Sequence, residues 1–330
     1  MLLSKLMIIV TGGAGFIGSA VAWKLNIQGR EDLIIVDHLE TSENWKNLVS
    51  IKYDRYIEKN HFLSQLLSGK LPKIDAIIHM GACSATTEQN MDYLMENNVQ
   101  YTQILMEWCI QNKVRFIYAS SAATYGNGEH GFNDDHAIIP RLKPINRYGY
   151  SKQLVDEFAL KRGYLNHCVG LKFFNVYGPN EYHKGDMKSI IAKAYTQIKE
   201  SGNIKLFKSY KSQYPDGGQM RDFVYVKDCV DAIWWLLNTP SVNGIFNIGT
   251  GQSRTWNDLA AAVFNSMNYP IDITYIDMPD SIKNQYQYYT EASMQKLIDK
   301  GYPHNLTSLE AGVADYVHHY LSQQFAHLSV

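Results

Sequence analysis

Tyr148 and Lys152 have a spacing that suits proton transfer, at the start of an expected helix in "NRYGYSKQLVDEF". Residues four apart share one face of a helix, so the two side chains point the same way. A free phenol has a pKa of ~10 and is a poor base near neutrality, but a nearby ammonium together with a bound cationic ring favours the phenolate and lowers that value. Tyr148 would then exchange a proton with a substrate alcohol. Because Tyr-x-x-x-Lys is common by chance, the assignment needs support from other motifs.

Ser121 supplies part of that support. The stretch "YASSAATYG" places it at the end of an expected strand at 115–120, on the edge of a parallel sheet where ligands bind. Its hydroxyl could hold the substrate oxygen that exchanges a proton with Tyr148. The alternative is a hydroxyl that only caps the strand.

Another basic group, Lys184, lies in the loop "YGPNEYHKGDMKS" at 177–189. One interpretation is a solvated basic turn, or a lysine that only binds phosphate or substrate hydroxyls. The other is a second acid/base, whose pKa must lie below the reference value of ~10.4, through burial or a neighbouring cation. We interpret His183 as a positioning residue, since no partner shows metal-ligand spacing. The sequence predicts no metal site.

A glycine-rich turn near the start of the chain predicts a dinucleotide site. In "IIVTGGAGFIGSAVAWKL" a strand, a turn with Gly12, Gly15 and Gly18, and a helix follow one another. Glycine lets the backbone approach a pyrophosphate closely, and the helix N-terminus supplies oriented N–H groups. Asp37 ends the second strand about where an acid that binds the ribose is expected.

The choice between NAD and NADP stays open on these residues alone. The Asp37 carboxylate would bind a ribose 2′-hydroxyl and repel a 2′-phosphate, which slightly favours NAD. Lys46 and Lys59 lie downstream, and their positive charges could bind a 2′-phosphate.

Composition excludes several classes of partner. The chain has 330 residues, and 31 Lys+Arg against 32 Asp+Glu leave a net charge of -1. Nothing in that balance argues for nucleic acid or an anionic membrane, and no apolar run approaches the ~18 residues of a membrane span. The four cysteines are widely spaced, which predicts reduced thiols and a cytoplasmic location. We interpret "MLLSKLMIIV" as a first strand, because it runs into "TGGAGFIG" without a signal-peptide cleavage site.

Short apolar runs at 6–10, 33–37, 76–80, 115–120 and 169–174 alternate with amphipathic segments. This alternation predicts an α/β fold, a doubly wound parallel Rossmann sheet with a smaller α/β substrate-binding domain. The cofactor-binding Rossmann domain would span 1–174 and be rejoined by about 221–250, where "RDFVYVKDCVDAIWWLL" resembles a strand and helix returning to the main sheet. The substrate-binding domain would comprise 175–220 and about 251–330.

The glycine turn, Ser121 and the Tyr148–Lys152 pair together resemble the extended short-chain dehydrogenase/reductase family of nucleotide-sugar enzymes. Within that family the chain is similar to the ADP-L-glycero-D-manno-heptose 6-epimerases, bacterial enzymes that finish the heptose donor of the lipopolysaccharide inner core. Six stretches carry this resemblance over almost the whole chain: "GACSATTEQN", "YASSAATYG", "FFNVYGPNEYHKG", "GGQMRDFVYV", "FNIGTG" and "QYQYYTEA". The most specific are "GACS" with "TTE" and the "HKG" loop.

The resemblance implies that C6 of ADP-heptose is oxidised to a ketone and receives the same hydride back, with Tyr148 and Lys184 as the two acid/base groups. It implies a cofactor site made of Gly12, Gly15, Phe16, Ile17, Gly18, Asp37, His38, Asn44, Lys59, Met80, Gly81, Ala82, Cys83, Ser84, Asn97, Lys152, Val176 and Lys184. It implies a substrate site made of Ser121, Asn175, Asp186, Lys193, Phe207, Lys208, Ser209, Arg221 and Tyr286. Arg221 suits a diphosphate because a guanidinium offers a planar fork of donors; the alternative is a surface pair with Asp222.

The resemblance further implies tightly held NADP, with NAD as the alternative, and a homo-oligomer, commonly a pentamer. Three departures from the family's pattern affect the finer contacts. Asn44 stands where better-known members have a Lys that can meet the 2′-phosphate, Asp186 replaces a common Ser, and Lys193 replaces a His.

A UDP-hexose 4-epimerase is the main alternative function, since it shares the core motifs but not "HKG" or "GACS". A 4,6-dehydratase would need an acidic pair to eliminate water, and the positions before Tyr125 hold only Ala and Thr. A non-catalytic dinucleotide sensor on this fold would have no reason to keep all four catalytic candidates.

Overall fold

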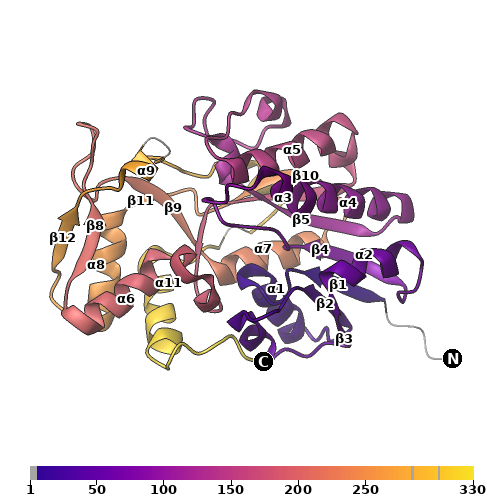
Figure 1. The fold of residues 1–330 in the computed structure, drawn as a ribbon, viewed down its shortest axis with the longest axis horizontal. Coiled ribbons are helices and arrows are strands. Elements are labelled where there is room, and N and C mark those ends of the chain that lie inside the picture. The colour runs from indigo at the N-terminus through magenta and orange to yellow at the C-terminus, as the bar shows by residue number, and fades with distance from the viewer. Residues whose placement is uncertain (1–5, 284–285, 304) are drawn as a thin grey trace.

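A computed structural model of the chain describes residues 6–283, 286–303 and 305–330. Its centre is a seven-stranded parallel sheet with the order β10-β6-β5-β4-β1-β2-β3 (Figure 1). Its strands are β1 (Met7–Thr11), β2 (Leu33–Asp37), β3 (Arg55–Glu58), β4 (Ile74–His79), β5 (Arg115–Ser121), β6 (Cys168–Phe173) and β10 (Gly244–Ile248). The five predicted strands are confirmed, and β3 and β10 extend the sheet at its two edges.

Helices cover both faces of this sheet, as the doubly wound fold requires. Alternate residues of a strand point to opposite faces, and β1 contributes Ile8 and Val10 to one apolar core but Met7 and Ile9 to the other. Helices α1 (Phe16–Ile27) and α7 (Val226–Asn238) lie over the first core. Helices α2 (Lys59–Leu67), α4 (Tyr101–Asn112) and α5 (Arg147–Lys161) lie over the second.

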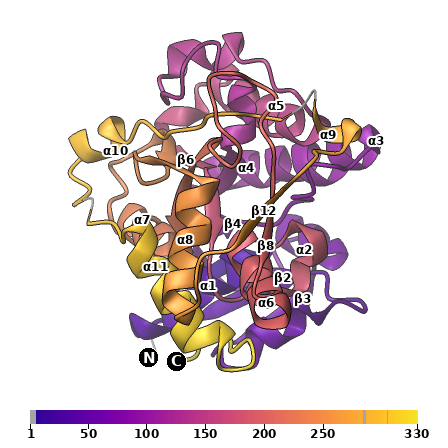
Figure 2. The ribbon, with the colours of Figure 1, turned by 90° about the vertical axis from the view of Figure 1, so that its left-hand side faces the viewer.

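A smaller part of the molecule extends from one end of the sheet and faces the viewer in Figure 2. It contains two small sheets, with the strand orders β11-β9-β7 and β12-β8. Its strands are β7 (Asn175–Tyr177), β8 (Ile204–Phe207), β9 (Met220–Tyr225), β11 (Ser253–Thr255) and β12 (Ile273–Ile276), and its main helices are α6 (Ile190–Ser201), α8 (Trp256–Met267) and α11 (Leu309–Tyr316). Shorter helices and turns are η1 (Glu43–Leu48), α3 (Met91–Leu94), η2 (Met95–Gln100), η3 (Ala122–Tyr125), η4 (His136–Arg141), η5 (Tyr164–Asn166), η6 (Tyr182–Met187), α9 (Asp280–Lys283), α10 (Gln295–Asp299) and η7 (Val317–Leu321).

One strand assignment from the sequence is wrong. Strand β9, expected to return to the main sheet, pairs with β7 and β11 instead. The place beside β6 is taken by β10, so the chain rejoins the large sheet through α7 and β10. The boundaries of the two proposed domains remain predictions.

The carboxyl ends of β1, β4, β5 and β6 meet at one edge of the parallel sheet, where ligands bind in open α/β folds. The glycine turn, residues 80–84, Ser121 and the start of β7 are thereby brought together. In the described parts of the chain, every helix is too short or too polar to cross a membrane. Those same parts contain no cluster of three His, Cys, Asp or Glu residues that could hold a metal ion.

Candidate active site

One cavity of about 390 Å³ gathers the four catalytic candidates at this edge of the sheet. Ser121, Tyr148, Lys152 and Lys184 all line it. Its wall also includes several residues expected at the cofactor or substrate: Phe16, Ile17, Met80, Ala82, Ser84, Asn175 and Val176. Residues that lie far apart in the sequence therefore share one small volume.

Tyr148 lies in the first turn of α5, whose capping residue Asn146 accepts a hydrogen bond from Gly149 N at 2.7 Å. Burial raises the pKa of the Tyr148 phenol, and a hydrogen bond with Ser121 opposes the rise. In the protein alone burial dominates, and the lowering expected from the ammonium together with the cofactor's positive ring remains a prediction. Lys152 Nζ donates instead to Ala119 O at 2.9 Å.

Lys152 is almost fully buried. Burial lowers its pKa to about 8, while the charge of Asp156 opposes this. An ammonium with few protein partners at a cavity wall is well placed to bind the hydroxyls of a ribose.

A buried ion pair lies behind these residues, and the sequence reasoning missed it. Lys172 Nζ lies 2.7 Å from Asp156 Oδ2, and the exposed fractions of the two side chains are 1% and 0%. The Asp156 carboxylate also accepts a hydrogen bond from Ser120 Oγ at 2.7 Å. Asp156 follows Lys152 by one helical turn and Ser120 precedes Ser121, so the Ser120–Asp156 bond joins the two elements that carry these catalytic candidates, and Lys172 ties both to β6. The sequence does contain an indication of this ion pair. Its lysine lies inside the apolar run "VGLKFF", and a buried charge requires a partner.

The glycine turn has the close backbone contacts that a dinucleotide site requires. Gly12 has φ 63°, and a Cβ atom there would lie 2.5 Å from Gly81 N, at the end of β4. A Cβ atom on Gly18 would lie 2.0 Å from Gly12 O. Any side chain at Gly12 or Gly18 would therefore force β1, β4 or α1 apart, and these positions fit a bound dinucleotide.

The end of β2 forms an acidic corner beside this turn. Asp37 Oδ2 accepts hydrogen bonds from two N–H groups of the turn, at 2.7 and 3.2 Å. The His38 ring lies between two carboxylates, with Nε2 2.8 Å from Glu40 Oε1 and Nδ1 3.1 Å from Glu58 Oε1. Three carboxylates thus surround the place expected for the adenosine ribose.

Two lysines expected to balance that charge are already engaged. Lys59 Nζ donates to Asn97 Oδ1 at 2.6 Å, and Lys46 pairs with Glu43. Asn44 is buried next to His38, and its Oδ1 atom has no hydrogen-bond partner among the described residues. A small cavity of about 150 Å³ is lined by Thr11, Gly12, Val36, Asp37, His38, Lys59, Gly81, Ala82, Tyr93, Asn97 and Tyr101. It shares Ala82 with the catalytic cavity, so the two form the ends of one path.

The loop that carries Lys184 is closed by a buried carboxylate. Glu181 accepts hydrogen bonds from Ser189 N and Ser189 Oγ, both at 2.6 Å, and from Tyr316 OH at 3.0 Å. Lys184 Nζ lies 5.4 Å from the centre of the Phe16 ring. Burial lowers the pKa of Lys184, with the charge of Glu181 opposing the change. The direction is the one that a general base requires.

A second cavity, of about 550 Å³, adjoins the catalytic one. Lys193, Phe207 and Tyr286 line it, as expected for substrate residues, and Ile190 and Trp256 line both cavities. The two volumes can therefore accept two parts of one elongated ligand.

Arg221 lies against the aromatic wall of this second cavity. Its guanidinium is 5.1 Å from the ring centre of Tyr286 and 5.8 Å from that of Trp256. It donates to the carbonyl oxygens of Met220 and Gln287, and no carboxylate of the described residues pairs with it. The alternative pair with Asp222 is wrong, because the Asp222 carboxylate accepts hydrogen bonds from the backbone at 250, 251 and 292.

Like Gly15, Gly18, Asn44 and Arg221, four further expected substrate or cofactor residues line none of these cavities. Lys208 pairs with Asp277 at 3.3 Å, and Ser209 Oγ donates to Lys211 O. Asp186 is exposed, and its carbonyl oxygen accepts from Lys193 Nζ at 2.6 Å. The backbone of Cys83 is held by Asn98. The roles of all four remain predictions.

The sequence reasoning also missed residues on the cavity walls. Gln287 and Thr290 line the catalytic cavity, and Thr290 Oγ1 is buried without a hydrogen-bond partner in the described part of the chain. Both lie in the tyrosine-rich stretch after 285, where only Tyr286 was singled out.

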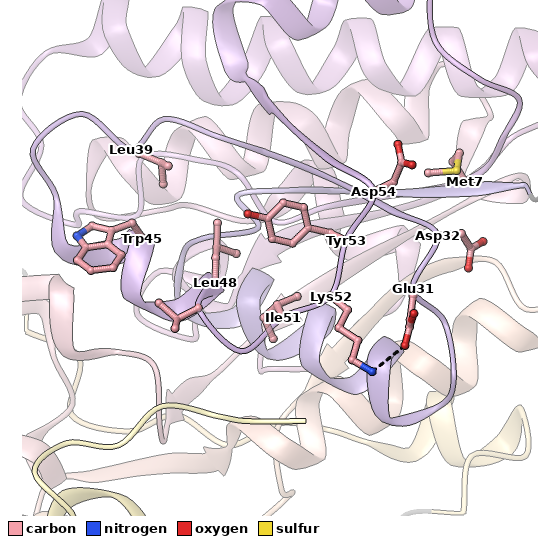
Figure 3. Close-up of a pocket in the computed structure, with 11 residues that line it drawn as sticks. Met7, Glu31, Asp32, Leu39, Trp45, Leu48, Ile51, Lys52, Tyr53 and Asp54 are labelled. Carbon is pink, nitrogen blue, oxygen red and sulfur yellow. Dashed lines mark hydrogen bonds and ion pairs between the residues drawn. The ribbon is translucent and has the colours of Figure 1, made fainter.

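A larger hollow, of about 860 Å³, lies away from this chemistry beside β2 and the segment before β3. Figure 3 shows Trp45 at one end and the Glu31–Lys52 ion pair at the other. None of the four catalytic candidates lines it. Size alone therefore does not locate the active site.

Comparison with known proteins agrees with the geometry. Residues 8–249 match the NAD dependent epimerase/dehydratase family. The chain belongs to this family. A relative from Nitratidesulfovibrio vulgaris, named ADP-L-glycero-D-manno-heptose-6-epimerase, is 58% identical over 317 residues, which cover 96% of this chain and 98% of the relative. A relative of the same name from Fusobacterium nucleatum is 48% identical and covers 98% of this chain and 100% of its own length.

Solved structures give the same grouping. The Helicobacter pylori ADP-L-glycero-D-manno-heptose-6-epimerase is 29% identical, with a TM-score of 0.79 over 96% of each chain. A UDP-glucose 4-epimerase from Thermotoga maritima, solved with UDP-glucose, is 25% identical, with a TM-score of 0.79 over 97% of this chain and 100% of its own.

The buried Lys172–Asp156 pair gives a prediction about stability. Lys172→Met leaves the carboxylate of Asp156 buried without its cation, and we expect it to lower the free energy of unfolding by about 3–5 kcal/mol. Combining it with Asp156→Asn should recover most of that loss, because the amide is uncharged and its oxygen can still accept from Ser120 and Tyr118. Urea unfolding followed by circular dichroism measures both. A single-substitution loss below about 1 kcal/mol would contradict the role of the pair.

Proposed function

We propose that the protein interconverts ADP-D-glycero-β-D-manno-heptose and ADP-L-glycero-β-D-manno-heptose by inverting C6. The observation that carries this proposal is that Tyr148 and Lys184, from two separate elements, line the same cavity. The names of relatives that are 58% and 48% identical over nearly their full lengths support the choice of substrate. The product would serve lipopolysaccharide inner-core synthesis in the cytoplasm.

Inversion at one carbon requires proton transfer at two positions. When bound, a nicotinamide dinucleotide supplies a hydride acceptor and donor of fixed orientation. Tyr148 takes the proton of the C6 hydroxyl as hydride leaves C6, and the Ser121 hydroxyl holds the oxygen of the resulting 6-ketone. For inversion the ketone must present its other face, which moves its oxygen away from Tyr148. Lys184 then supplies the proton as hydride returns, and the roles reverse in the other direction.

The two adjoining cavities suit the two halves of the substrate. The heptose would lie in the catalytic cavity beside Asn175 and Thr290. The adenosine would lie in the second cavity against Phe207 and Tyr286. Arg221, behind the aromatic wall, would attract the diphosphate between them.

We propose that the cofactor is NADP, as the resemblance implies. NAD is the alternative, and the acidic corner at the end of β2 favours it. Asp37, Glu40 and Glu58 would all repel a 2′-phosphate, and the uncharged side chain of Asn44 does not offset this repulsion. Mass spectrometry of the nucleotide released on denaturation identifies the resident cofactor. A homo-oligomer, pentameric by family analogy, also belongs to the proposal, and sedimentation velocity tests it.

The reaction itself is tested with purified protein, the D-glycero substrate, deuterated water and no added cofactor. We expect conversion to the L-glycero epimer without deuterium at C6, observed by NMR, because a bound cofactor returns the hydride it received. Deuterium at C6 would instead indicate exchange with solvent and exclude direct hydride return. No conversion, even with added NAD or NADP, would refute the heptose assignment and favour the alternative UDP-hexose 4-epimerase.

The role of Lys184 is tested by comparing two substitutions. Lys184→Met and Lys184→Arg should each lower kcat for C6 inversion by ~10²–10⁴-fold, as expected for loss of a general acid/base. Arginine keeps the positive charge but does not give up its proton near neutrality. If Lys184→Arg retained most of the activity, Lys184 would be a binding group only.

Asn44→Lys should raise the affinity for NADP relative to NAD roughly tenfold, since one charge-assisted contact to a phosphate is worth about that factor. Isothermal titration of cofactor-free protein with each dinucleotide gives the ratio. Asn44→Leu is the matched control, because it removes the amide without adding charge. An unchanged ratio in Asn44→Lys would show that the 2′-position lies elsewhere.

A further inference from the structure

The segment 326–329, here called the strap, crosses from the smaller part of the molecule to the cofactor-binding part. Figure 1 shows this yellow stretch passing from the region of α11 to the base of α1. Its far end is held there by Trp23 Nε1, which donates to Ser329 O at 2.9 Å. Leu328 is fully buried, so the strap is packed rather than loosely attached.

The strap contacts the loop that carries Lys184 at two points. Tyr182 OH donates to Ala326 O at 2.8 Å. Leu328 N donates to Asn180 Oδ1 at 2.9 Å. These loop residues lie two and four positions before Lys184, so the strap fixes the backbone that leads directly to the catalytic ammonium.

Asn180 needs such support because its backbone is strained. It has φ 77°, which is unusual for a residue other than glycine. Its Nδ2 atom donates to Ser19 Oγ at 2.9 Å, and its carbonyl oxygen accepts from Asn47 Nδ2 at 3.0 Å. Together with the bond from Leu328, these contacts hold the conformation in place.

Asn47 connects the strap to the glycine turn. Its Nδ2 atom donates to Ala14 O at 2.8 Å as well as to Asn180 O. Both partners are carbonyl oxygens, which only accept, so the orientation of the amide is determined. Asn47 Oδ1 therefore faces His327 Nδ1, 2.7 Å away, and His327 must carry its proton on that nitrogen.

These contacts form one buried junction between the strap, the glycine turn and the Lys184 loop. Lys184 Nζ lies against Phe16, two residues after Ala14, so the turn and the loop also meet at the ammonium. Sequence reasoning found His183 and Lys184 but gave no role to any residue of the strap.

We propose that His327, through Asn47 and Asn180, is a positioning residue that fixes Lys184 in the catalytic cavity. The proposal rests on the proposed function, in which Lys184 exchanges a proton at the C6 oxygen. In this proposal His327 touches neither the substrate nor the cofactor and acts only through the junction. A shift of about 1 Å in a catalytic group can cost ~10²-fold in rate, so loss of the junction would be seen in kcat.

The test compares His327→Leu with His327→Asn in the full-length protein. Leucine removes the donor to Asn47, whereas asparagine can place an amide N–H near the position of Nδ1. We expect His327→Leu to lower kcat roughly ten- to hundredfold with a much smaller change in KM, and His327→Asn to remain near wild type. His318→Leu is the matched control, since His318 bonds Ser266 O in α8 and no residue of the junction, and it should leave kcat unchanged.

A double-mutant cycle separates positioning from general damage. If His327 acts through Lys184, His327→Leu should cause no further loss in the Lys184→Met background. A full additional loss there would overturn the proposal, as would wild-type kcat in His327→Leu. If His327→Leu does not fold, Tyr182→Phe replaces it, because that change keeps the ring and removes the hydroxyl that bonds Ala326 and Tyr316.

A second readout does not depend on the reaction. Reductive methylation with ¹³C-formaldehyde allows NMR titration of lysines, and the Lys184 signal is the one absent in Lys184→Arg. We expect the pKa of Lys184 to rise toward its ordinary value in His327→Leu as water reaches the amine, and to stay low in His318→Leu. An unchanged titration would refute the positioning role. If the wild type failed to invert the heptose, the proposed function would fail while this titration still tested the junction.

Discussion

The close approach of two backbones, at Gly12 and Gly81, is the constraint on which the rest of the site depends. A Cβ atom on Gly12 would lie 2.5 Å from Gly81 N, so the ends of β1 and β4 can be this close only because Gly12 has no side chain. That contact determines where the glycine turn begins, and thereby where Asp37, Phe16 and α1 lie. The adenosine corner and the catalytic cavity share Ala82, the residue after Gly81. The geometry of the whole cofactor path is thus determined by backbone packing before any polar group contributes.

Some of the buried charges near this path have a counter-ion, and others do not. The Lys172–Asp156 pair is buried and balanced, and the bond from Ser120 to Asp156 joins β5 to α5 behind Ser121 and Lys152. Lys152 and Arg221 are also buried, but their ammonium and guanidinium groups donate to carbonyl oxygens only, and burial lowers both pKa values. Burying a cation without a counter-ion costs free energy, which a bound anion or ribose can offset. The charge of the Lys172–Asp156 pair is therefore balanced within the pair, whereas Lys152 and Arg221, which we propose to face ligands, have no carboxylate partner among the described residues.

The sequence predicted those parts that depend on local pattern. Alternating apolar runs, the glycine spacing and the helical Tyr148–Lys152 pair each report on a few neighbouring residues, and the central sheet and catalytic cavity agree with them. Strand β9 was misplaced because its pattern fits any buried strand, and only β10, twenty residues later, decides which strand lies beside β6. The partners of Asp156 and Asn47 were missed because their contacts join segments up to 280 positions apart. The rise in the pKa of Tyr148 in the protein alone was not predicted, because burial cannot be read from spacing.

The position of Lys184 explains why the smaller part of the molecule is joined to the larger one so firmly. An alcohol dehydrogenation needs one acid/base, and a residue on the Rossmann part, such as Tyr148, is sufficient. A second acid/base for the inverted oxygen must come from another direction, and the group proposed for it, Lys184, lies on a loop after β7, outside the main sheet. A loop positions a side chain less accurately than a strand or helix, so this lysine needs additional fixed points. Glu181 closes the loop from one side, and Asn180 and the strap hold it from the other. In the proposed mechanism, the demands of inversion thus account for the buried polar contacts that hold this loop.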